Sequence, residues 1–508
     1  MLASNHKLIL RNTGMLYIRM LLAMVVSLYT SRIVLNILGV EDFGTYHVVA
    51  GFVALLGFML GAMTTATQRY FAFDLGQNNG KNLRDLFNTS LQVHALLAIC
   101  IVIVAETFGY WFVSTQLTIP PDRLDSTVMV YHLSIVAFAV NVITIPLTAM
   151  VMANERMGLF ALMSMADVLL KLVAVLLLPY LAYDKLSMYA ALLLVVALIT
   201  FISYLLITRS VFPAVRLQWG WNANSFRSML GFTAWNTWGN LAAAMSEQGN
   251  NVLLNIFFGP TVNAGRSIAS QANGALNSFV SNVQAAVNPQ IIKLYGSGNK
   301  AEMHKLVLRA AKYNFYILLT LAMPVLLNTE ALLKLWLVQV PPYAAVFLQL
   351  TIIASLINSI SGPLMTSAQA TGHIRLYHTV VGGILLFNVP VSYTFLLYGL
   401  APETILIVTI GLAIIALIAR LYIIAPLINL PIGSFLSNVI ARISLVSMIA
   451  GGIAALLQIT AGESLLALLG NLVIPISASL VTVWFFGLDK SEKQNIAKIL
   501  KLLRARIS

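Results

Sequence analysis

Residues 187–208 read SMYAALLLVVALITFISYLLIT and contain no charged side chain. A helix needs about 20 mostly apolar residues to cross a hydrocarbon core of roughly 30 Å, so this stretch has the length and composition of a membrane span. Unsatisfied backbone groups are too costly in lipid for an open chain, and the stretch is too long and too uniformly apolar for a barrel strand. We therefore predict a transmembrane helix here.

Segments of the same kind recur from Thr13 to Gly487. The 508-residue sequence is 59% hydrophobic and only 9% charged, with a mean hydropathy of +0.88, which is far from the balance of a soluble domain. The predicted spans cover residues 13–38, 43–66, 86–114, 127–153, 157–182, 187–212, 229–258, 261–288, 308–337, 343–371, 374–400, 402–428, 436–461 and 464–487. The sequence thus predicts an all-α polytopic membrane protein with about 14 transmembrane helices.

The connections between these spans carry an uneven charge. The face that includes the N-terminus carries 23 Lys and Arg residues, whereas the opposite face carries three, Arg123, Lys185 and Lys334. Because connections rich in Lys and Arg remain in the cytoplasm, both termini are predicted to be cytoplasmic. The net charge of +13 is then mainly topological. No basic patch interleaved with stacking aromatics is present, so we expect no nucleic-acid partner.

A short internal echo predicts two parallel lobes. The sequence VLNI at 34–37, followed by Gly39, returns as LLNI at 253–256, followed by Gly259. Six predicted spans separate the copies, so both halves enter the membrane from the same face, as in transporters built from parallel repeats. We predict two six-helix lobes plus a C-terminal helix pair: an N-lobe over 1–213, a cytoplasmic linker over 214–228, a C-lobe over 229–428, spans 13 and 14 over 429–487, and a basic cytoplasmic tail over 488–508.

Three arginines are candidates for a role inside predicted spans, where a charge is costly and commonly faces a cavity or a partner. Arg19 and Arg32 belong to the first span, and Arg266 belongs to the eighth. A guanidinium can hold a phosphate through paired hydrogen bonds. It can also reach the membrane interface by extending its side chain, and this second interpretation stays open for Arg32 and Arg266.

Acidic side chains inside the spans are candidates for ion coupling. Asp167 and Lys171 lie one helical turn apart in the fifth span and can neutralise each other, so a structural pair is an equal alternative. Glu247 lies near the middle of the seventh span. It either pairs with Arg266 or forms a proton or cation site, and the sequence does not separate these two roles.

Spans 7 and 8 are unusually polar. The residues that share a face are Asn236, Asn240, Glu247, Asn251 and Asn255 in span 7, and Ser267, Ser270, Gln271, Gly274, Asn277, Ser278, Ser281 and Asn288 in span 8. Such side chains either hold helices together by hydrogen bonds or line a water-filled groove that binds a polar ligand such as a sugar. The candidates for substrate binding are Asn240, Asn251, Ser270, Gln271 and Asn277.

Signatures of enzymes and cofactors are scarce. The sequence GQNNGKN at 76–82 is one residue short of a phosphate-binding loop and lacks its final Ser or Thr. The seven histidines are scattered without the spacing of metal ligands, and the single cysteine, Cys100, allows no disulfide within one chain. We expect a protein that is not an enzyme and that uses no cofactor or metal.

Two stretches resemble a known family. RNT at 11–13 through SR at 31–32, followed by LGVEDFGTY at 38–46, is similar to the region near the first outer turn of polysaccharide flippases. AGRSIASQ at 264–271, continued by NPQI at 288–291 and Lys293, resembles their eighth helix and its exit. The likeness extends over essentially the whole chain through the fourteen helices and the two-lobe repeat. The family is the O-antigen, Wzx-type branch of the multidrug/oligosaccharidyl-lipid/polysaccharide exporter (MOP) superfamily.

The resemblance implies a flippase that moves undecaprenyl-pyrophosphate-linked oligosaccharides to the periplasmic leaflet of a bacterial inner membrane, for O-antigen or capsule assembly, by alternating access. Related lipid II flippases place arginines of the first and eighth helices in a central cavity, which makes Arg19, Arg32 and Arg266 the corresponding candidates. The acidic companion of the first-helix arginine is absent, since Met20 follows Arg19. Na⁺ or H⁺ is the expected coupling ion, and the expected partners are the lipid-linked glycan, membrane lipids and other polysaccharide assembly proteins.

Two alternatives stay open. One is an ion-coupled drug or cation antiporter of the same superfamily, although those proteins typically have twelve helices. The other is a membrane polysaccharide polymerase or ligase, which is disfavoured because the longest outer loop, at about residues 115–126, holds only Asp122, Arg123 and Asp125 as charged residues.

Overall fold

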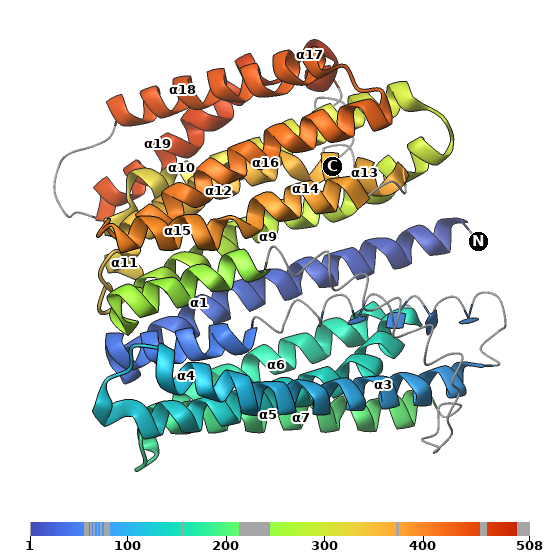
Figure 1. Ribbon diagram of the computed structural model, residues 1–508. Helices are drawn as coiled ribbons and strands as arrows, with labels where there is room; N and C mark the ends of the chain where they lie inside the picture. The colour runs from blue at the N-terminus through green and yellow to red at the C-terminus, as the bar shows by residue number, and fades with distance from the viewer. Residues whose placement is uncertain are drawn as a thin grey trace. The chain divides into compact units, whose positions relative to one another are not determined.

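All regular structure in the described part of the chain is helical, as Figure 1 shows. The computed structural model describes residues 2–54, individual residues between 60 and 75, and residues 82–154, 156–212, 244–371, 375–457 and 465–494. The prediction of an all-α polytopic membrane protein is confirmed. Helices form because each span must satisfy its own backbone hydrogen bonds in lipid.

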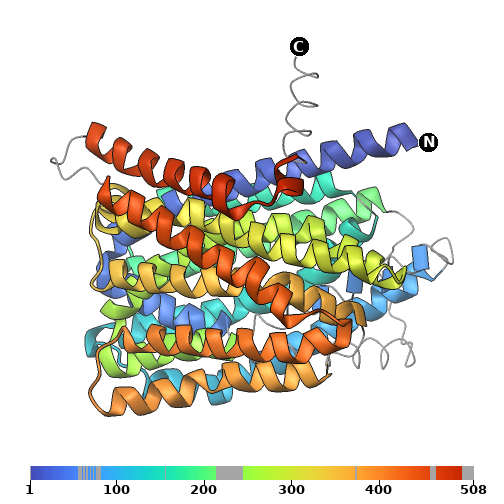
Figure 2. The ribbon, with the colours of Figure 1, turned by 90° about the horizontal axis from the view of Figure 1, so that it is seen from above.

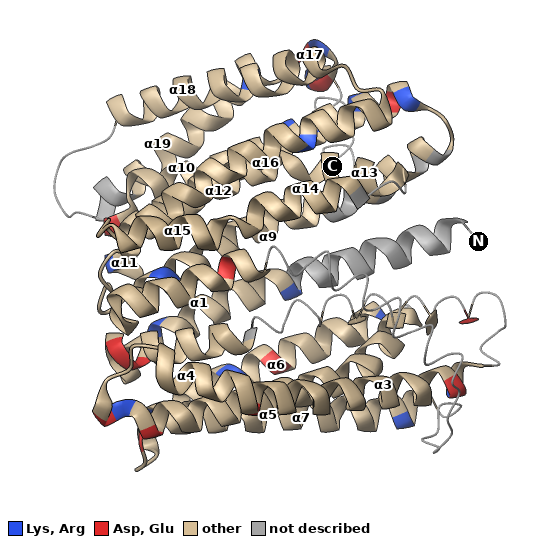
Figure 3. Ribbon diagram, viewed as in Figure 1, with Lys and Arg blue, Asp and Glu red and all other residues tan. Residues whose placement is uncertain are grey.

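Eleven helices of the described residues are long and apolar enough to cross a membrane. The second and seventh predicted spans extend into residues outside the described ranges. The helix at the eighth predicted span, α9 (Pro260–Gly296), is long enough but is not among the eleven, because amides and hydroxyls recur along it. The count of about 14 spans therefore stays a prediction. Figure 3 shows long stretches of helix without charge and many of the charged residues near helix ends.

The chain divides into two compact units. The first comprises Met1–Ile268, Leu337–Pro342 and Val389–Pro402, and the second comprises Ala269–Trp336, Tyr343–Asn388 and Glu403–Ser508. The predicted linker over 214–228 lies outside the described residues, and the predicted lobe boundaries stay a prediction.

The first unit is built on α1 and four helical segments that follow it. Its elements are α1 (Leu2–Ala54), α3 (Leu83–Val104), the π-helical turn η2 (Ala105–Gly109), α4 (Tyr110–Gln116), η3 (Pro121–Arg123), α5 (Leu124–Ala153), α6 (Met157–Leu177), η4 (Leu178–Tyr180) and α7 (Lys185–Val211). Helix α5 packs on α3 and α7, and α1 packs on α6. A core cluster that includes Phe87, Leu147, Met150 and Tyr204 joins these helices.

The second unit packs around α10 and α16. Its elements beyond α9 are α10 (Lys300–Leu327), α11 (Thr329–Trp336), α12 (Ala344–Ser359), α13 (Ser361–Thr371), α14 (Arg375–Leu386), α16 (Thr404–Ile428), α17 (Ile432–Phe435), η5 (Leu436–Ile440), α18 (Ala441–Leu456), α19 (Leu465–Thr482) and η6 (Val483–Gly487). Helix α16 contacts α12, α13 and α14, and α10 contacts α12 and α19. Figure 2 shows the same helices from above. The short helix α15 (Asn388–Leu397) falls almost entirely in the first unit.

The sequence echo corresponds to one backbone conformation. Gly39, which interrupts α1, and Gly259, which precedes α9, both have φ of +78°, a value that favours glycine. At the second copy the Gly259 N–H donates to the Asn255 carbonyl at 2.8 Å, which ends the helix before the turn. The helices after the two turns approach closely within the first unit. A Cβ added at Gly44 would lie 1.8 Å from the Pro260 carbonyl oxygen, so this position admits no side chain.

Candidate functional site

Arg32 lies on an exposed face of α1. The face also carries Leu21, Val25 and Tyr29, and Asn36 follows Arg32 one turn later. Among the described residues, no hydrogen bond or ion pair holds the Arg32 guanidinium. An exposed apolar residue in a span is expected against lipid, whereas an exposed arginine needs water or an anion. Arg32 is therefore available to a negatively charged ligand.

Arg19 lies about 20 Å from Arg32 along the same helix, given a rise of 1.5 Å per residue. Its guanidinium donates to the Ser164 hydroxyl at 3.4 Å and stacks over the Phe160 ring, with its central carbon 5.2 Å from the ring centroid. Both partners belong to α6. The buried Nε of Arg19 makes no hydrogen bond. Helix α6 thus holds Arg19 in place but leaves its Nε–H donor without a hydrogen bond.

The Asp167–Lys171 ion pair forms as the i,i+4 spacing predicts. The Lys171 Nζ lies 2.7 Å from Asp167 Oδ2, and the Thr200 hydroxyl of α7 donates to the other carboxylate oxygen at 3.2 Å. The carboxylate is therefore neutralised within its own helix and tied to a neighbour. Its part in ion coupling stays a prediction.

Glu247 and Arg266 interact electrostatically within the first unit. Arg266 is buried in α9, whereas Glu247 is exposed. The choice between a pair with Arg266 and a proton or cation site for Glu247 stays a prediction. Because burying a guanidinium is costly without compensating partners, the nearby carboxylate stabilises Arg266 in α9.

The predicted polar face of span 7 is partly used for packing. Asn236 and Asn240 lie outside the described residues. Asn251 donates to Gln248 at 2.8 Å, and its carbonyl accepts from Asn263 at 2.7 Å. Asn255 is fully buried and accepts from the Thr118 N–H at 2.9 Å. For Asn255, this contact favours a role in packing over a role in lining a groove.

The predicted residues of span 8 from Ser270 onward belong to the second unit, whereas Ser267 lies in the first. Asn277 donates to the Ser355 hydroxyl of α12 at 3.1 Å and to its own helix at Asn273. Ser270 and Gln271 are half-buried, and Gln271 has a polar contact of its own. Asn277 therefore joins α9 to α12, while a substrate-binding role for Ser270 and Gln271 stays a prediction.

The second unit contains an amide network that the sequence did not predict. Gln284 lies at its centre: its Oε1 accepts from Asn314, and its Nε2 donates to Asn288 and, at 3.4 Å, to Thr366. Thr366 also donates to Asn288 at 2.7 Å. The network joins α9, α10 and α13. Only Asn288 stood out in the sequence, because the other members are isolated polar residues on helices whose contacts the sequence does not reveal.

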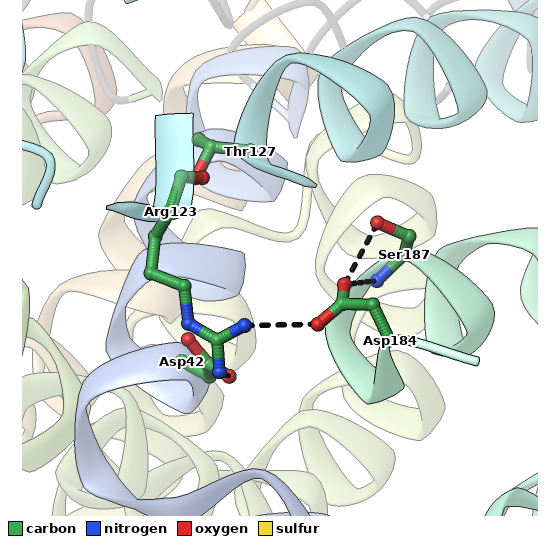
Figure 4. A network of polar contacts seen from close by, with 5 residues as sticks. All are labelled: Asp42, Arg123, Thr127, Asp184 and Ser187. Carbon is green, nitrogen blue, oxygen red and sulfur yellow. Dashed lines mark hydrogen bonds and ion pairs between the residues drawn. The ribbon is translucent and has the colours of Figure 1, made fainter. Parts of the chain in front are cut away.

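A charged network at one end of the first unit was also missed. Arg123 was recognised as one of three cations on the predicted outer face, but its partners were not. Its guanidinium contacts the buried Asp42 at 2.5 Å and Asp184 at 2.9 Å, as Figure 4 shows. Asp184 also accepts from the Ser187 N–H and hydroxyl, both at 2.9 Å, and so caps α7. Arg123 thus ties α1 to the start of α7.

The pKa of Asp184 lies below its ordinary value. Burial acts to raise this pKa, but the hydrogen bonds from Ser187 and Ser126 and the charge of Arg123 outweigh burial. A carboxyl with a lowered folded-state pKa stabilises the fold above its ordinary pKa of about 4, and this contribution is lost as the pH falls through the folded-state value.

We therefore expect acid to destabilise the wild-type protein more than an Asp184→Asn variant below about pH 4. Thermal unfolding in detergent, followed by size-exclusion chromatography at neutral and acid pH, measures the difference. Asp125→Asn is the matched control, because Asp125 is an exposed acid in the first turn of α5. An equal acid response in wild type and Asp184→Asn would show that the network contributes nothing to stability.

The fold is that of a membrane protein with many helices, some of which carry arginines inside their spans. Several solved structures share this fold. A structure described as "Lipid II flippase MurJ, inward closed conformation" matches with a TM-score of 0.74 and 13% identity over 94% of this chain and 98% of that chain. The MATE multidrug transporter DinF-BH matches with a TM-score of 0.63 and 13% identity, over 84% and 97%. An outward-facing MATE family transporter of the MOP superfamily matches with a TM-score of 0.60 and 16% identity, over 82% and 95%.

The chain therefore shares its fold with these flippase and transporter structures, one of which is described as a member of the MOP superfamily. No family model matches the sequence. No curated protein matches it either.

Proposed function

We propose that this protein is a flippase of the polysaccharide branch, moving undecaprenyl-pyrophosphate-linked oligosaccharide units from the cytoplasmic to the periplasmic leaflet of a bacterial inner membrane by alternating access. Both termini would lie in the cytoplasm, and Na⁺ or H⁺ would supply the energy. The product would serve O-antigen or capsule assembly. The fold shared with a lipid II flippase over 94% of the chain supports a lipid-linked substrate.

The exposed Arg32 is the observation that carries this proposal. It presents a guanidinium inside a span without a protein counter-charge among the described residues. A pyrophosphate is an anion whose oxygens match the planar donor fork of arginine. Arg266 is a second candidate, but it is buried and already interacts with Glu247, so its substitution would also affect the fold. Arg32 therefore gives the cleaner test.

Replacing Arg32 with alanine should abolish surface polysaccharide in a deletion strain carrying the variant, while the protein stays in the membrane at normal amount. Undecaprenyl-linked repeat units should accumulate facing the cytoplasm, and extraction of labelled lipid-linked intermediates measures them. Tyr29→Leu is the matched control, since Tyr29 lies on the same exposed face one turn away and carries no charge. Normal polysaccharide from Arg32→Ala would contradict the proposal.

A drug or cation antiporter is the second candidate, because two MATE transporters share the fold. They cover 82% and 84% of this chain, whereas the lipid II flippase covers 94%. An antiporter predicts that deletion sensitises cells to cationic dyes and leaves surface polysaccharide intact. Outward-facing, unpolymerised repeat units in the deletion strain would instead indicate a polymerase.

A further inference from the structure

The side chains of Glu106 and His132 meet inside the first unit and play no part in the proposed substrate site. The His132 Nδ1 lies 2.8 Å from Glu106 Oε2. Glu106 belongs to η2, about 15 Å from the end of α4 at Gln116, and His132 lies about 12 Å beyond the start of α5 at Leu124, given 1.5 Å per residue. Both side chains thus lie well inside candidate membrane spans.

The partner of Glu106 distinguishes it from the carboxylates that the sequence suggested for ion coupling. Asp167 is paired with Lys171, and Glu247 interacts with Arg266. Lysine and arginine are cations at neutral pH, so neither partner supplies a weak base. An imidazole is the side chain whose ordinary pKa, about 6.5, lies in that range. The Glu106–His132 pair therefore joins a carboxylate to the side-chain type suited to carrying a proton, whereas the other two carboxylates have permanent cations as partners.

The apolar side chains around the Glu106–His132 pair favour the state in which the pair holds one proton. Apolar side chains near the pair in sequence are exposed, including Phe108, Trp111 and Val136, and an exposed apolar residue in a span is expected against lipid. With one proton the pair has no net charge, whereas without it the pair carries one negative charge. Low-dielectric surroundings disfavour the charged form, so the deprotonated pair needs water, while the protonated pair tolerates lipid.

The local backbone is built around this pair. The π-helical turn η2 widens the helix at Glu106, and such turns recur at functional sites. Tyr131 donates from its hydroxyl to the Ala105 carbonyl at 2.6 Å, and Tyr110 of α4 stacks on His132 with ring centroids 5.6 Å apart. These two tyrosines are the titratable neighbours that contact the pair's own segments. Gly109 is needed for this approach, since a Cβ there would lie 2.2 Å from the Tyr131 oxygen.

We propose that the Glu106–His132 pair is the proton-binding site that couples a pH gradient to transport. The proton comes from water on the acidic side, is held between His132 Nδ1 and Glu106 Oε2, and returns to water on the opposite side. No other bond forms or breaks. The two protonation states favour different exposure of the pair to water and so bias different conformations of the protein. The coupling role rests on the proposed transport function.

Proton uptake by the purified protein tests the site directly. Infrared difference spectra of carboxyl and imidazole bands should show one proton bound by the wild type between about pH 8 and pH 5. Glu106→Gln and His132→Gln should each lose it. Asp167→Asn and His304→Gln are the matched controls and should retain it, because Asp167 is paired with Lys171 and the His304 ring contacts the Ile428 carbonyl at 2.8 Å. Uptake that is unchanged in both pair variants overturns the site.

Flipping in proteoliposomes tests the coupling, with undecaprenyl-pyrophosphate carrying a fluorescent trisaccharide as the probe. With one proton per cycle, an imposed gradient of one pH unit should change the ratio of the probe between the two leaflets about tenfold. His132→Lys places a permanent cation beside Glu106, so flipping should continue but no longer respond to the gradient. A His132→Lys variant that still responds overturns the coupling role. A wild-type protein that takes up the proton but flips no probe overturns the flippase proposal and leaves the proton site standing.

Discussion

Replacing Glu492 with alanine should destabilise the protein by about 3–5 kcal/mol, because it leaves a buried ammonium group without its counter-charge. Glu492 and Lys312 are almost completely buried, with side-chain exposures of 0% and 3%, and their charged atoms lie 2.9 Å apart. Arg309 adds a second cation at 3.6 Å. Removing the carboxylate leaves Lys312 without its counter-charge in the interior of the second unit.

The same glutamate also starts the helical turn that follows η6. Its carboxylate accepts from the Asp489 N–H at 2.9 Å, while the Asp489 carboxylate accepts from the Glu492 N–H at 2.8 Å, a reciprocal cap at a helix start. Glu492 thus fixes the chain onto α10 as it leaves the last span. We expect the Glu492→Ala protein to unfold in detergent at a clearly lower temperature.

A double variant, Lys312→Met with Glu492→Met, is the control for this prediction. Replacing both members of a buried pair by apolar residues of similar volume is often neutral, so the double variant should recover much of the lost stability. Lys305→Ala provides a second comparison, since its pair with Glu302 is exposed and should contribute far less to stability than the buried pair. Equal unfolding temperatures for Glu492→Ala and wild type would mean that the buried pair does not stabilise the fold.

Replacing Gly44 with alanine should destabilise the first unit by about 1–3 kcal/mol or more, because extra atoms in a well-packed contact force the backbone apart. The added Cβ would lie 1.8 Å from the Pro260 carbonyl oxygen and 3.2 Å from the Ala264 nitrogen. Both neighbours are backbone atoms and cannot rotate away. The helix after the first glycine turn would therefore have to move from the start of α9.

Gly411→Ala on α16 is the matched control. This glycine is exposed and has no atom within 4 Å of an added Cβ, so alanine should be neutral or should stabilise the helix by up to about 1 kcal/mol. Thermal unfolding and the amount of protein recovered from membranes measure both variants. If Gly44→Ala matched Gly411→Ala, the approach of the two helices would not constrain the first unit.

Local spacing predicted the interactions that one helix makes with itself. Asp167 and Lys171 were expected to pair because four residues span one turn, and the ion pair forms at 2.7 Å. Gly39 and Gly259 were expected to hold equivalent places, and both adopt φ of +78°. In each case the deciding geometry lies within a few residues of the chain.

Spacing could not predict interactions between helices. Arg123 was recognised as an outer-face cation, yet its contacts with Asp42 and Asp184 join residues 81 and 61 positions away. Glu106 and His132 were not paired, because their meeting depends on the π-helical turn and on how α5 packs beside it. Asn255 belonged to a polar face that could equally have lined a groove, and its bond to Thr118 favours packing.

The hydropathy of the chain is enough to establish that it crosses the membrane repeatedly as helices, because an unsatisfied backbone is too costly in hydrocarbon for a long apolar segment to adopt another structure. The sequence also locates arginines inside those spans. Which of these polar groups already have partners is seen only in the folded protein. Lys312 pairs with Glu492, whereas Arg32 has no partner among the described residues. That difference depends on the rotation and packing of whole helices, which the hydropathy of a segment does not specify.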